Sequence, residues 1–165
     1  MDRPFTEPRT LTETALYPGI AMIEGANVSV GRGTETPFDL LGAPWIDGSK
    51  LANYLNGQAI KGVAFVAIDF KPKESVYQNR FCHGIGISLA DREALDAPAL
   101  GIEIASAIFR LYPGTFEIDK TLGMVGTCSI VEAIKNGEYP ASIVGRWQTP
   151  LESFLAIQQK YLIYP

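Results

Sequence analysis

The sequence has 165 residues, 47% of them hydrophobic and 19% charged, which predicts one folded domain rather than a disordered chain. A formal net charge of −4 and the lack of any run of like charges argue against a nucleic acid partner, although one arginine can still hold a single anion. No run of 18 apolar residues predicts a membrane span, and the polar first residues lack the apolar core of a signal peptide. The chain as written is expected in the cytoplasm, unless an export signal precedes it.

The first half of the chain predicts short strands with one helix among them. Residues 1–18 hold three prolines and no apolar periodicity, which predicts an extended lead-in with at most a helical turn at 10–16. Residues 63–70, VAFVAIDF, form an apolar run of strand length that we expect to be buried. Residues 84–90 alternate between large and small side chains, which is typical of a strand with room for a close neighbour on one face. The remaining expected elements are strands at 19–28 and 38–45 and a helix at 50–56.

The second half of the chain predicts helices. Within residues 98–111 the polar side chains of Glu103, Ser106 and Arg110 recur three and four positions apart, so a solvated stripe runs along an otherwise buried helix. One central sheet with helices packed on it accommodates all the predicted elements. The sequence therefore predicts an α+β fold with its helices concentrated in the C-terminal half, as a single domain over residues 19–165 after the lead-in.

Two capping-box patterns predict where the last two helices begin. The first is SIVE at residues 129–132, and the second is TPLE at 149–152, which places Pro150 at the first helical position. The residues of the last helix that are then expected to be buried are Leu151, Phe154, Leu155, Tyr161 and Leu162, with Gln158 buried in part.

The loop at residues 24–38, EGANVSVGRGTETPF, is the strongest candidate for contact with a ligand. Gly31 and Gly33 flank Arg32, and glycine permits both positive φ and a close approach of the backbone. An arginine held in this way presents a fork of donors to a carboxylate or a phosphate. The other hydrogen-bonding side chains within ten residues are Glu24, Asn27, Ser29 and Thr34. Together these groups suit a polyhydroxylated ligand with one acidic group.

A purely structural loop explains the same residue types about equally well. Arg32 would then hold a backbone carbonyl or Glu35, and the glycines would serve turns. The stretch lacks the GxxxxGK[ST] pattern of a phosphate-binding loop and the third glycine of a dinucleotide fingerprint. Neither nucleotide-binding motif is therefore predicted.

Other candidate residues carry weaker signals. Cys82 and His83 have the chemistry of a nucleophile and a base, but the side chains of sequence neighbours rarely face each other. Core packing is favoured over sugar stacking for Trp45 and Trp147. Cys82, Cys128 and the single histidine lack the spacing of a metal site, so no metal or cofactor is predicted. Two free buried thiols are favoured over a disulfide between the two cysteines.

Residues 17–47, YPGIAMIEGANVSVGRGTETPFDLLGAPWID, resemble the signature of the NamZ-like exo-β-N-acetylmuramidases, a bacterial family of peptidoglycan-recycling glycoside hydrolases. The pattern EGxNxSxGRGTxxPF is long and specific. One departure is QNRFCH at 78–83, where relatives carry Gly-Glu shortly before Cys-Gly-Gly. The resemblance spans almost the whole chain, through CHGI at 82–85, Asp91-Arg92, LYPGTF at 111–116 and KYLIYP at 160–165.

The resemblance covers one lobe of such an enzyme. Family members typically carry an N-terminal Rossmann-like lobe with the acidic catalytic residue, and the active site lies between the lobes. The resemblance therefore implies that this chain supplies no catalytic residue and needs the other lobe, or a partner chain, to complete it. Family members are often exported. The residues that would form this lobe's wall of the cleft are Glu24, Asn27, Ser29, Arg32 and Thr34.

The ligand implied by the resemblance is a terminal N-acetylmuramic acid, and its lactyl carboxylate is a chemically suitable partner for Arg32. Three functions are compatible with the sequence: a C-terminal muramidase lobe that is inactive alone, a stand-alone carbohydrate- or muropeptide-binding module, and an unrelated domain whose GRGT loop holds a phosphate. An exposed apolar patch beside residues 24–38 would favour the first function, because it would be an uncovered docking face. A closed polar pocket without such a patch would favour the second, and a preference for nucleotides the third.

Overall fold

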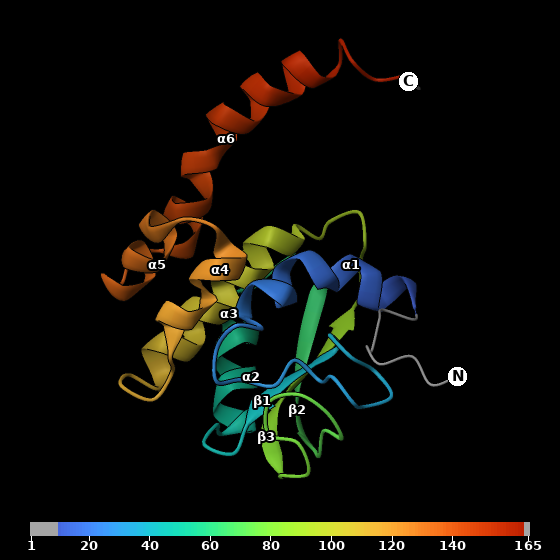
Figure 1. The fold of residues 1–165 in the computed structure, drawn as a ribbon, viewed down its shortest axis with the longest axis vertical. Coiled ribbons are helices and arrows are strands. Elements are labelled where there is room, and N and C mark those ends of the chain that lie inside the picture. The colour runs from blue at the N-terminus through green and yellow to red at the C-terminus, as the bar shows by residue number, and fades with distance from the viewer. Residues whose placement is uncertain (1–9, 164–165) are drawn as a thin grey trace.

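The computed structural model describes residues 10–163 and shows one three-stranded antiparallel sheet with helices packed on it (Figure 1). The strand order is β1-β3-β2, so β3 pairs with both neighbours. The predicted α+β fold, with its helices largely in the C-terminal half, is confirmed. In the described part of the chain, no helix is long and apolar enough to cross a membrane. The elements are α1 (Leu11–Ile20), η1 (Ala21–Ile23), β1 (Leu40–Ala43), α2 (Gly48–Gly57), β2 (Val63–Phe70), β3 (Cys82–Leu89), α3 (Ala97–Leu111), η2 (Ile118–Thr121), α4 (Leu122–Val125), α5 (Cys128–Lys135) and α6 (Pro140–Gln158).

The segment before the sheet forms a helix, α1, rather than an extended lead-in. The Thr10 hydroxyl accepts a hydrogen bond from the Glu13 amide at 3.1 Å, and the Glu13 carboxylate accepts one from the Thr10 amide at 3.2 Å. This reciprocal capping box begins the helix. The prediction of an extended chain is therefore wrong for residues 11–18, where the helical turn allowed at 10–16 is part of a longer helix. Residues 1–9 of the predicted lead-in lie outside the described residues.

The strand predicted at residues 19–28 is also wrong, because its first residues end α1 and continue into η1. Leu16, Ile20 and Ile23 are fully buried, and their spacing of four and then three residues is the helical period. The apolar content of this segment suggested a strand, but its periodicity is that of a helix packed on the core.

Strand β2 forms an edge of the sheet and is only half buried. Helix α2 packs against β2, and Phe65 is 4% exposed, whereas Val66 on the other face is 55% exposed. Asn56 of α2 covers part of the outer edge, because its side-chain amide donates to the Phe65 carbonyl at 2.8 Å and accepts from the Phe65 amide at 3.0 Å. The prediction of a strand at 63–70 is confirmed, but the prediction that it is buried is wrong.

Helix α6 is one continuous helix that extends away from the body of the protein (Figure 1). It begins at Pro140, so Pro150 lies inside the helix, where it removes a backbone hydrogen bond, rather than at its start. Helix α5 begins after the cap Thr127 rather than at Ser129, so neither predicted capping box starts a helix.

The second half of α6 does not pack on the core. Within α6, all of which the structure describes, Ile143 is the one buried residue. The predicted burial of the apolar residues in the last helix is wrong, because no element of the described fold covers this end of α6. The exposed large apolar residues after Pro150 are Leu151, Phe154, Leu155, Ile157, Tyr161, Leu162 and Ile163.

Candidate functional site

The glycines of the loop at residues 24–38 adopt the conformation that the sequence suggested. Gly31 and Gly33 have φ values of 77° and 78°, in the left-handed region that favours glycine. A Cβ atom on Gly33 would lie 2.4 Å from the backbone nitrogen of Glu74, so the loop also packs closely on the segment after β2. The Gly33 carbonyl accepts a hydrogen bond from the Lys73 amide at 3.2 Å, which joins the two segments.

Arg32 and Glu24 form a two-point ion pair across this loop. The Nε atom of Arg32 donates to Oε1 of Glu24, and Nη2 donates to Oε2 at 3.1 Å. The guanidinium also lies 4.9 Å from the ring centroid of the buried Phe38. The hydrogen bond that Arg32 donates to Glu24 raises the pKa of Arg32, so the guanidinium stays charged at any physiological pH. The side chains are 22% and 18% exposed, so this fixed charge pair reaches the surface.

Asn27, also predicted at the ligand face, instead holds a second loop in place. Its side-chain amide donates to the Thr115 carbonyl at 2.9 Å, and its Oδ1 accepts from the Glu117 amide at 2.9 Å. The Asn27 backbone carbonyl accepts a hydrogen bond from the Tyr77 hydroxyl. Asn27 therefore anchors the turn that follows α3 to the candidate loop.

Ser29 and Thr34 make local hydrogen bonds that shape the same loop. Ser29 is 2% exposed, and its hydroxyl accepts from the Gly31 amide at 3.3 Å. The Thr34 hydroxyl donates to the Gly31 carbonyl at 2.6 Å. The structure thus brings Glu24 and Arg32 together, turns Ser29 inward, and leaves Thr34 near the surface.

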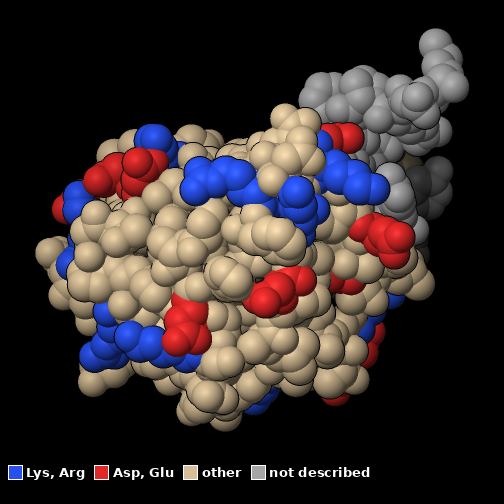
Figure 2. Space-filling view, turned by 90° about the horizontal axis from the view of Figure 1, so that it is seen from below, with Lys and Arg blue, Asp and Glu red and all other residues tan. Residues whose placement is uncertain are grey.

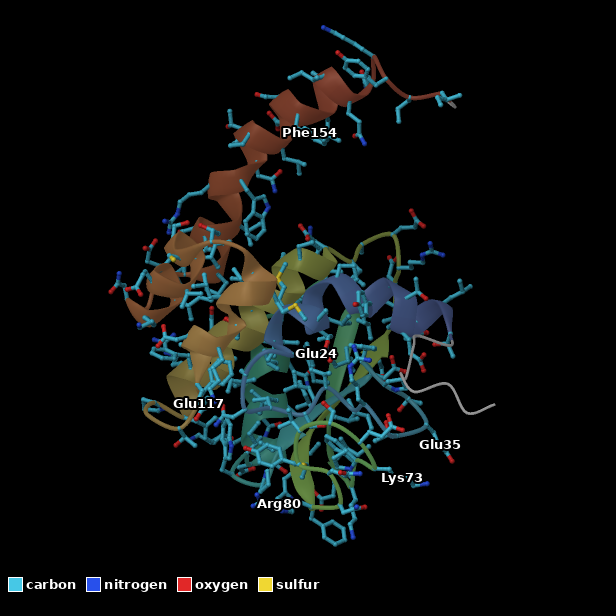
Figure 3. The ribbon with its side chains drawn as sticks, in the orientation of Figure 1. Glu24, Glu35, Lys73, Arg80, Glu117 and Phe154 are labelled. Carbon is cyan, nitrogen blue, oxygen red and sulfur yellow. The ribbon has the colours of Figure 1, made fainter. Side chains whose placement is uncertain are left out.

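A surface hollow of about 620 Å³ lies between the candidate loop and the segment after β2. Figure 3 shows Glu35 and Lys73 at this edge of the fold, on neighbouring loops, with Glu24 nearer the centre. The sequence interpretation missed the lysines here, although KPKE directly after an apolar strand is a basic signal that could have identified them. The residues around the hollow are Gly33, Thr34, Glu35, Thr36, Leu40, Phe70, Lys71, Lys73 and Glu74.

The charged side chains on the face seen in Figure 2 do not form one basic field. Lysine and arginine side chains lie in several groups, each close to acidic side chains. Such an arrangement suits local recognition of one anionic group better than the continuous basic footprint that a nucleic acid backbone requires.

Cys82 and His83 do not face each other, because successive residues of β3 point to opposite faces of the sheet. Cys82 is fully buried, and burial raises the pKa of its thiol to about 11, so it is not a thiolate at neutral pH. His83 instead lies 2.6 Å from Asp69 on the neighbouring strand, measured from Nδ1 to Oδ1. Both cysteines are free, but Cys128 is exposed, so the prediction of two buried thiols holds only for Cys82.

The two tryptophans differ in their surroundings. Trp147 is partly buried and packs against the core, as predicted. Trp45 also packs against the core, but its indole N–H donates to the Tyr77 hydroxyl at 3.0 Å, and the same hydroxyl donates to the Asn27 carbonyl at 3.1 Å. Trp45 therefore supports the candidate loop through Tyr77.

Asp39 directly follows the loop and has an unusual carboxylate. Its Oδ1 atom is buried and has no hydrogen-bond partner among the described residues. Burial, with a further contribution from the charge of Glu13, raises the pKa of Asp39 from 3.8 to about 6. Because the pKa is higher in the folded state than in the unfolded state, the folded state holds the proton more tightly. The free energy of unfolding therefore falls as the pH rises from about 4 to about 6.

Replacing Asp39 with asparagine should remove this titration. We expect Asp39→Asn to raise the free energy of unfolding by about 1–2 kcal/mol at pH 7.5, after allowance for partial solvent screening, and to leave it nearly unchanged at pH 3.5. Urea unfolding of both chains between pH 3.5 and 8 measures the difference. An equal change at every pH would contradict the burial of a charged carboxylate at this position.

The fold and the loop together define an α+β domain of a kind that occurs as one part of a larger chain. Two crystal structures of DUF1343 family proteins from Bacteroides fragilis share the fold. One has a TM-score of 0.75 and 23% sequence identity, and the match covers 92% of this chain and 42% of that one. The other has a TM-score of 0.73 and 27% identity, and the match covers 94% and 41%.

The family of this domain follows from the sequence. The model of the family described as "Exo-beta-N-acetylmuramidase NamZ, C-terminal" matches residues 15–164, so the chain belongs to this family, and the resemblance is confirmed. The peptidoglycan beta-N-acetylmuramidase NamZ of Bacillus subtilis (strain 168) is 37% identical over 158 residues. That match covers 94% of this chain but only 38% of the Bacillus protein, so the chain spans about two fifths of the length of these relatives.

Proposed function

We propose that this chain is the C-terminal lobe of an exo-β-N-acetylmuramidase-like glycoside hydrolase, which supplies one wall of the substrate cleft and is not catalytic alone. The observation that carries the proposal is the Glu24–Arg32 ion pair, which holds the Arg32 guanidinium in a fixed orientation on the signature loop of the family. The substrate is a terminal N-acetylmuramic acid, in keeping with the name of the Bacillus relative.

Arg32 is the residue that we assign to the lactyl carboxylate of the sugar. Glu24 restrains the guanidinium in one plane, and Phe38 supports it from the side, so the arginine is already oriented before a ligand binds. A guanidinium carries five N–H donors, so it can bind a second carboxylate while it remains paired with Glu24. Asn27 and Ser29 keep the loop in shape, whereas Thr34 lies where the loop borders the hollow and contributes there.

The lysines beside the hollow are local donors for an acidic ligand group. Lys71 and Lys73 follow β2 and border the same hollow as Thr34, with Glu35 and Glu74 as the acidic residues there. The hollow thus has two lysines and two glutamates around it, and it begins at Gly33, directly after Arg32. This arrangement explains how a chain with a net charge of −4 could still recognise an acidic sugar.

The exposed apolar residues favour a lobe of a larger enzyme over a stand-alone binding module. Leu122 and Met124 of α4 are 38% and 51% exposed, and α4 packs against η1, which ends next to Glu24. The exposed side chains of α6 add a second apolar surface. Exposed apolar surfaces of this kind mark sites of protein contact. We assign both to docking of the N-terminal lobe that the longer relatives carry.

Replacing Arg32 should separate the two sugars that differ in the lactyl group. We expect Arg32→Ala, made together with Glu24→Gln so that no unpaired carboxylate remains, to weaken binding of N-acetylmuramic acid at least about 10-fold. Binding of N-acetylglucosamine, which lacks the acid, should change less than about 2-fold. Titrations followed by NMR chemical shifts measure both affinities.

A second ion pair in the same chain supplies the control. Arg146 and Glu138 also pair eight residues apart, but they are exposed and lie away from the candidate loop. Arg146→Ala with Glu138→Gln should leave both affinities unchanged. An equal loss for the two sugars in the Arg32 variant would reject the role in carboxylate recognition.

A further inference from the structure

A second pocket lies among α2, α3 and the turn between α5 and α6. None of its lining residues belongs to the candidate loop at residues 24–38. Its volume is about 250 Å³, and the residues that carry the inference are Tyr54, Glu103, Ser106, Arg110, Ile134 and Tyr139. Three of these come from one face of α3, because residues three, four and seven positions apart on a helix share a face. The polar stripe predicted along α3, which consists of Glu103, Ser106 and Arg110, therefore lines one side of this pocket.

Glu103 gives this pocket an uncompensated negative charge. Its carboxylate makes no hydrogen bond or ion pair within the described part of the chain. Burial alone raises the pKa of Glu103, so the walls already shield this carboxylate from water. A half-buried carboxylate without a partner is a suitable acceptor for a cationic or hydrogen-bond-donating ligand group.

Arg110 places a positive charge at the other end of the same face. It lies two helical turns after Glu103, which is about 10 Å along the axis, and it is exposed. Its Nη1 atom donates to the Tyr54 hydroxyl at 3.4 Å, which holds the guanidinium toward α2 at the pocket. Between the two charged residues, the hydroxyl oxygen of Ser106 is buried and has no hydrogen-bond partner within residues 10–163, and Ile134 supplies an apolar wall.

We infer that this pocket binds a short zwitterionic ligand of about dipeptide length, with its ammonium group at Glu103 and its carboxylate at Arg110. The two residues are about 10 Å apart along the helix axis, which is longer than the distance between the two charged groups of a single α-amino acid. It suits the two ends of a dipeptide whose small apolar side chains face Ile134. This site is independent of the proposed sugar site, and neither inference requires the other.

Three forms of one probe test the inference on the intact chain. Alanyl-alanine carries both charges, N-acetyl-alanyl-alanine lacks the ammonium, and alanyl-alanine amide lacks the carboxylate. We expect saturable NMR shifts at residues around the pocket for alanyl-alanine, with a dissociation constant in the range of about 1–10 mM. Each blocked form should bind at least about 5-fold more weakly.

Two variants assign the two ends of the ligand. Glu103→Gln should weaken alanyl-alanine to the level of the acetylated form and leave the acetylated form unchanged. Arg110→Gln should have the corresponding effect for the amide form. Glu152→Gln on the exposed part of α6 is the matched control and should change nothing. Equal binding of all three probes, or no saturable shift at about 50 mM, would overturn the inference.

Discussion

Replacing Gly101 with alanine is expected to lower the free energy of unfolding by about 3 kcal/mol or more, because this glycine lets two helices touch backbone to backbone. A Cβ atom on Gly101 would lie 2.5 Å from the carbonyl oxygen of Gly19 and 3.0 Å from its Cα. A Cβ on Gly19 would in turn lie 2.0 Å from the carbonyl oxygen of Ala97. Neither contact involves a side chain that could move aside, so α1 and α3 would have to separate.

Separation of α1 and α3 would loosen the core on both sides of the crossing. Leu16 and Ile20 of α1 and Leu100 and Ile104 of α3 are fully buried, so a shift of either helix opens voids beside them. Alanine has the better helix propensity by about 1 kcal/mol, which offsets only part of this loss. Urea unfolding monitored by circular dichroism measures the net effect.

Gly145 provides the matched control for this prediction. It also lies inside a helix, α6, but a Cβ atom there would meet nothing within 4 Å. Gly145→Ala should therefore raise the free energy of unfolding by about 0.5–1 kcal/mol through helix propensity alone. Wild-type stability of Gly101→Ala would show that the two helices do not approach as closely as described.

The elements that the sequence predicts well are those with a strong periodic pattern. Helix α3 has a clear helical period and strand β3 a clear alternation of side chains. Both elements are confirmed, and each of their ends lies within two residues of the prediction. For α1 the sequence indicates only a helical turn at 10–16, because Pro18 and Gly19 are typical helix breakers, although the capping box at Thr10 and the spacing of Leu16, Ile20 and Ile23 are those of a full helix. Proline and glycine locally disfavour a helix in this segment, but the burial of Leu16, Ile20 and Ile23 in the core stabilises the helix in the folded protein.

The pairing of Glu24 with Arg32 could not be predicted from sequence spacing. The two residues are eight positions apart, and the intervening chain includes left-handed backbone at Gly31, which has a φ of 77°. A glycine pattern permits such angles but does not say which turn forms. The residue types indicated an anion-binding arginine, and the three-dimensional loop supplies its carboxylate neighbour.

Helix α6 shows a different limit of prediction from sequence. Its apolar residues repeat as they would on a packed helix, and they were therefore expected to be buried in this chain. The pattern shows that the residues are suited to burial but not which surface covers them. In the structure, Phe154 and Ile157 are 57% and 55% exposed, and Pro150 marks the point beyond which the helix leaves the core.

The last prediction concerns activity and the covering of α6. The isolated chain should not hydrolyse a chromogenic N-acetylmuramide. A chimera in which this chain replaces the matched region of the Bacillus subtilis relative should hydrolyse it, because the proposed cleft is then complete. Turnover by the isolated chain would overturn the proposal of a lobe that is inactive alone.

Charged residues on α6 should abolish the activity of that chimera without unfolding this lobe. The double substitution Phe154→Glu with Ile157→Glu removes two apolar side chains whose burial against the other lobe should contribute about 3–5 kcal/mol to docking, and it introduces two charges there. Turnover by the chimera should therefore fall at least about 100-fold. The same double variant in the isolated chain should change the free energy of unfolding by less than about 0.5 kcal/mol, because both side chains are exposed. Gln158→Glu, at an exposed polar position of the same helix, is the control. Full activity of the doubly charged chimera would show that the other lobe does not dock on α6, since no interface tolerates two buried and unpaired carboxylates at its apolar centre.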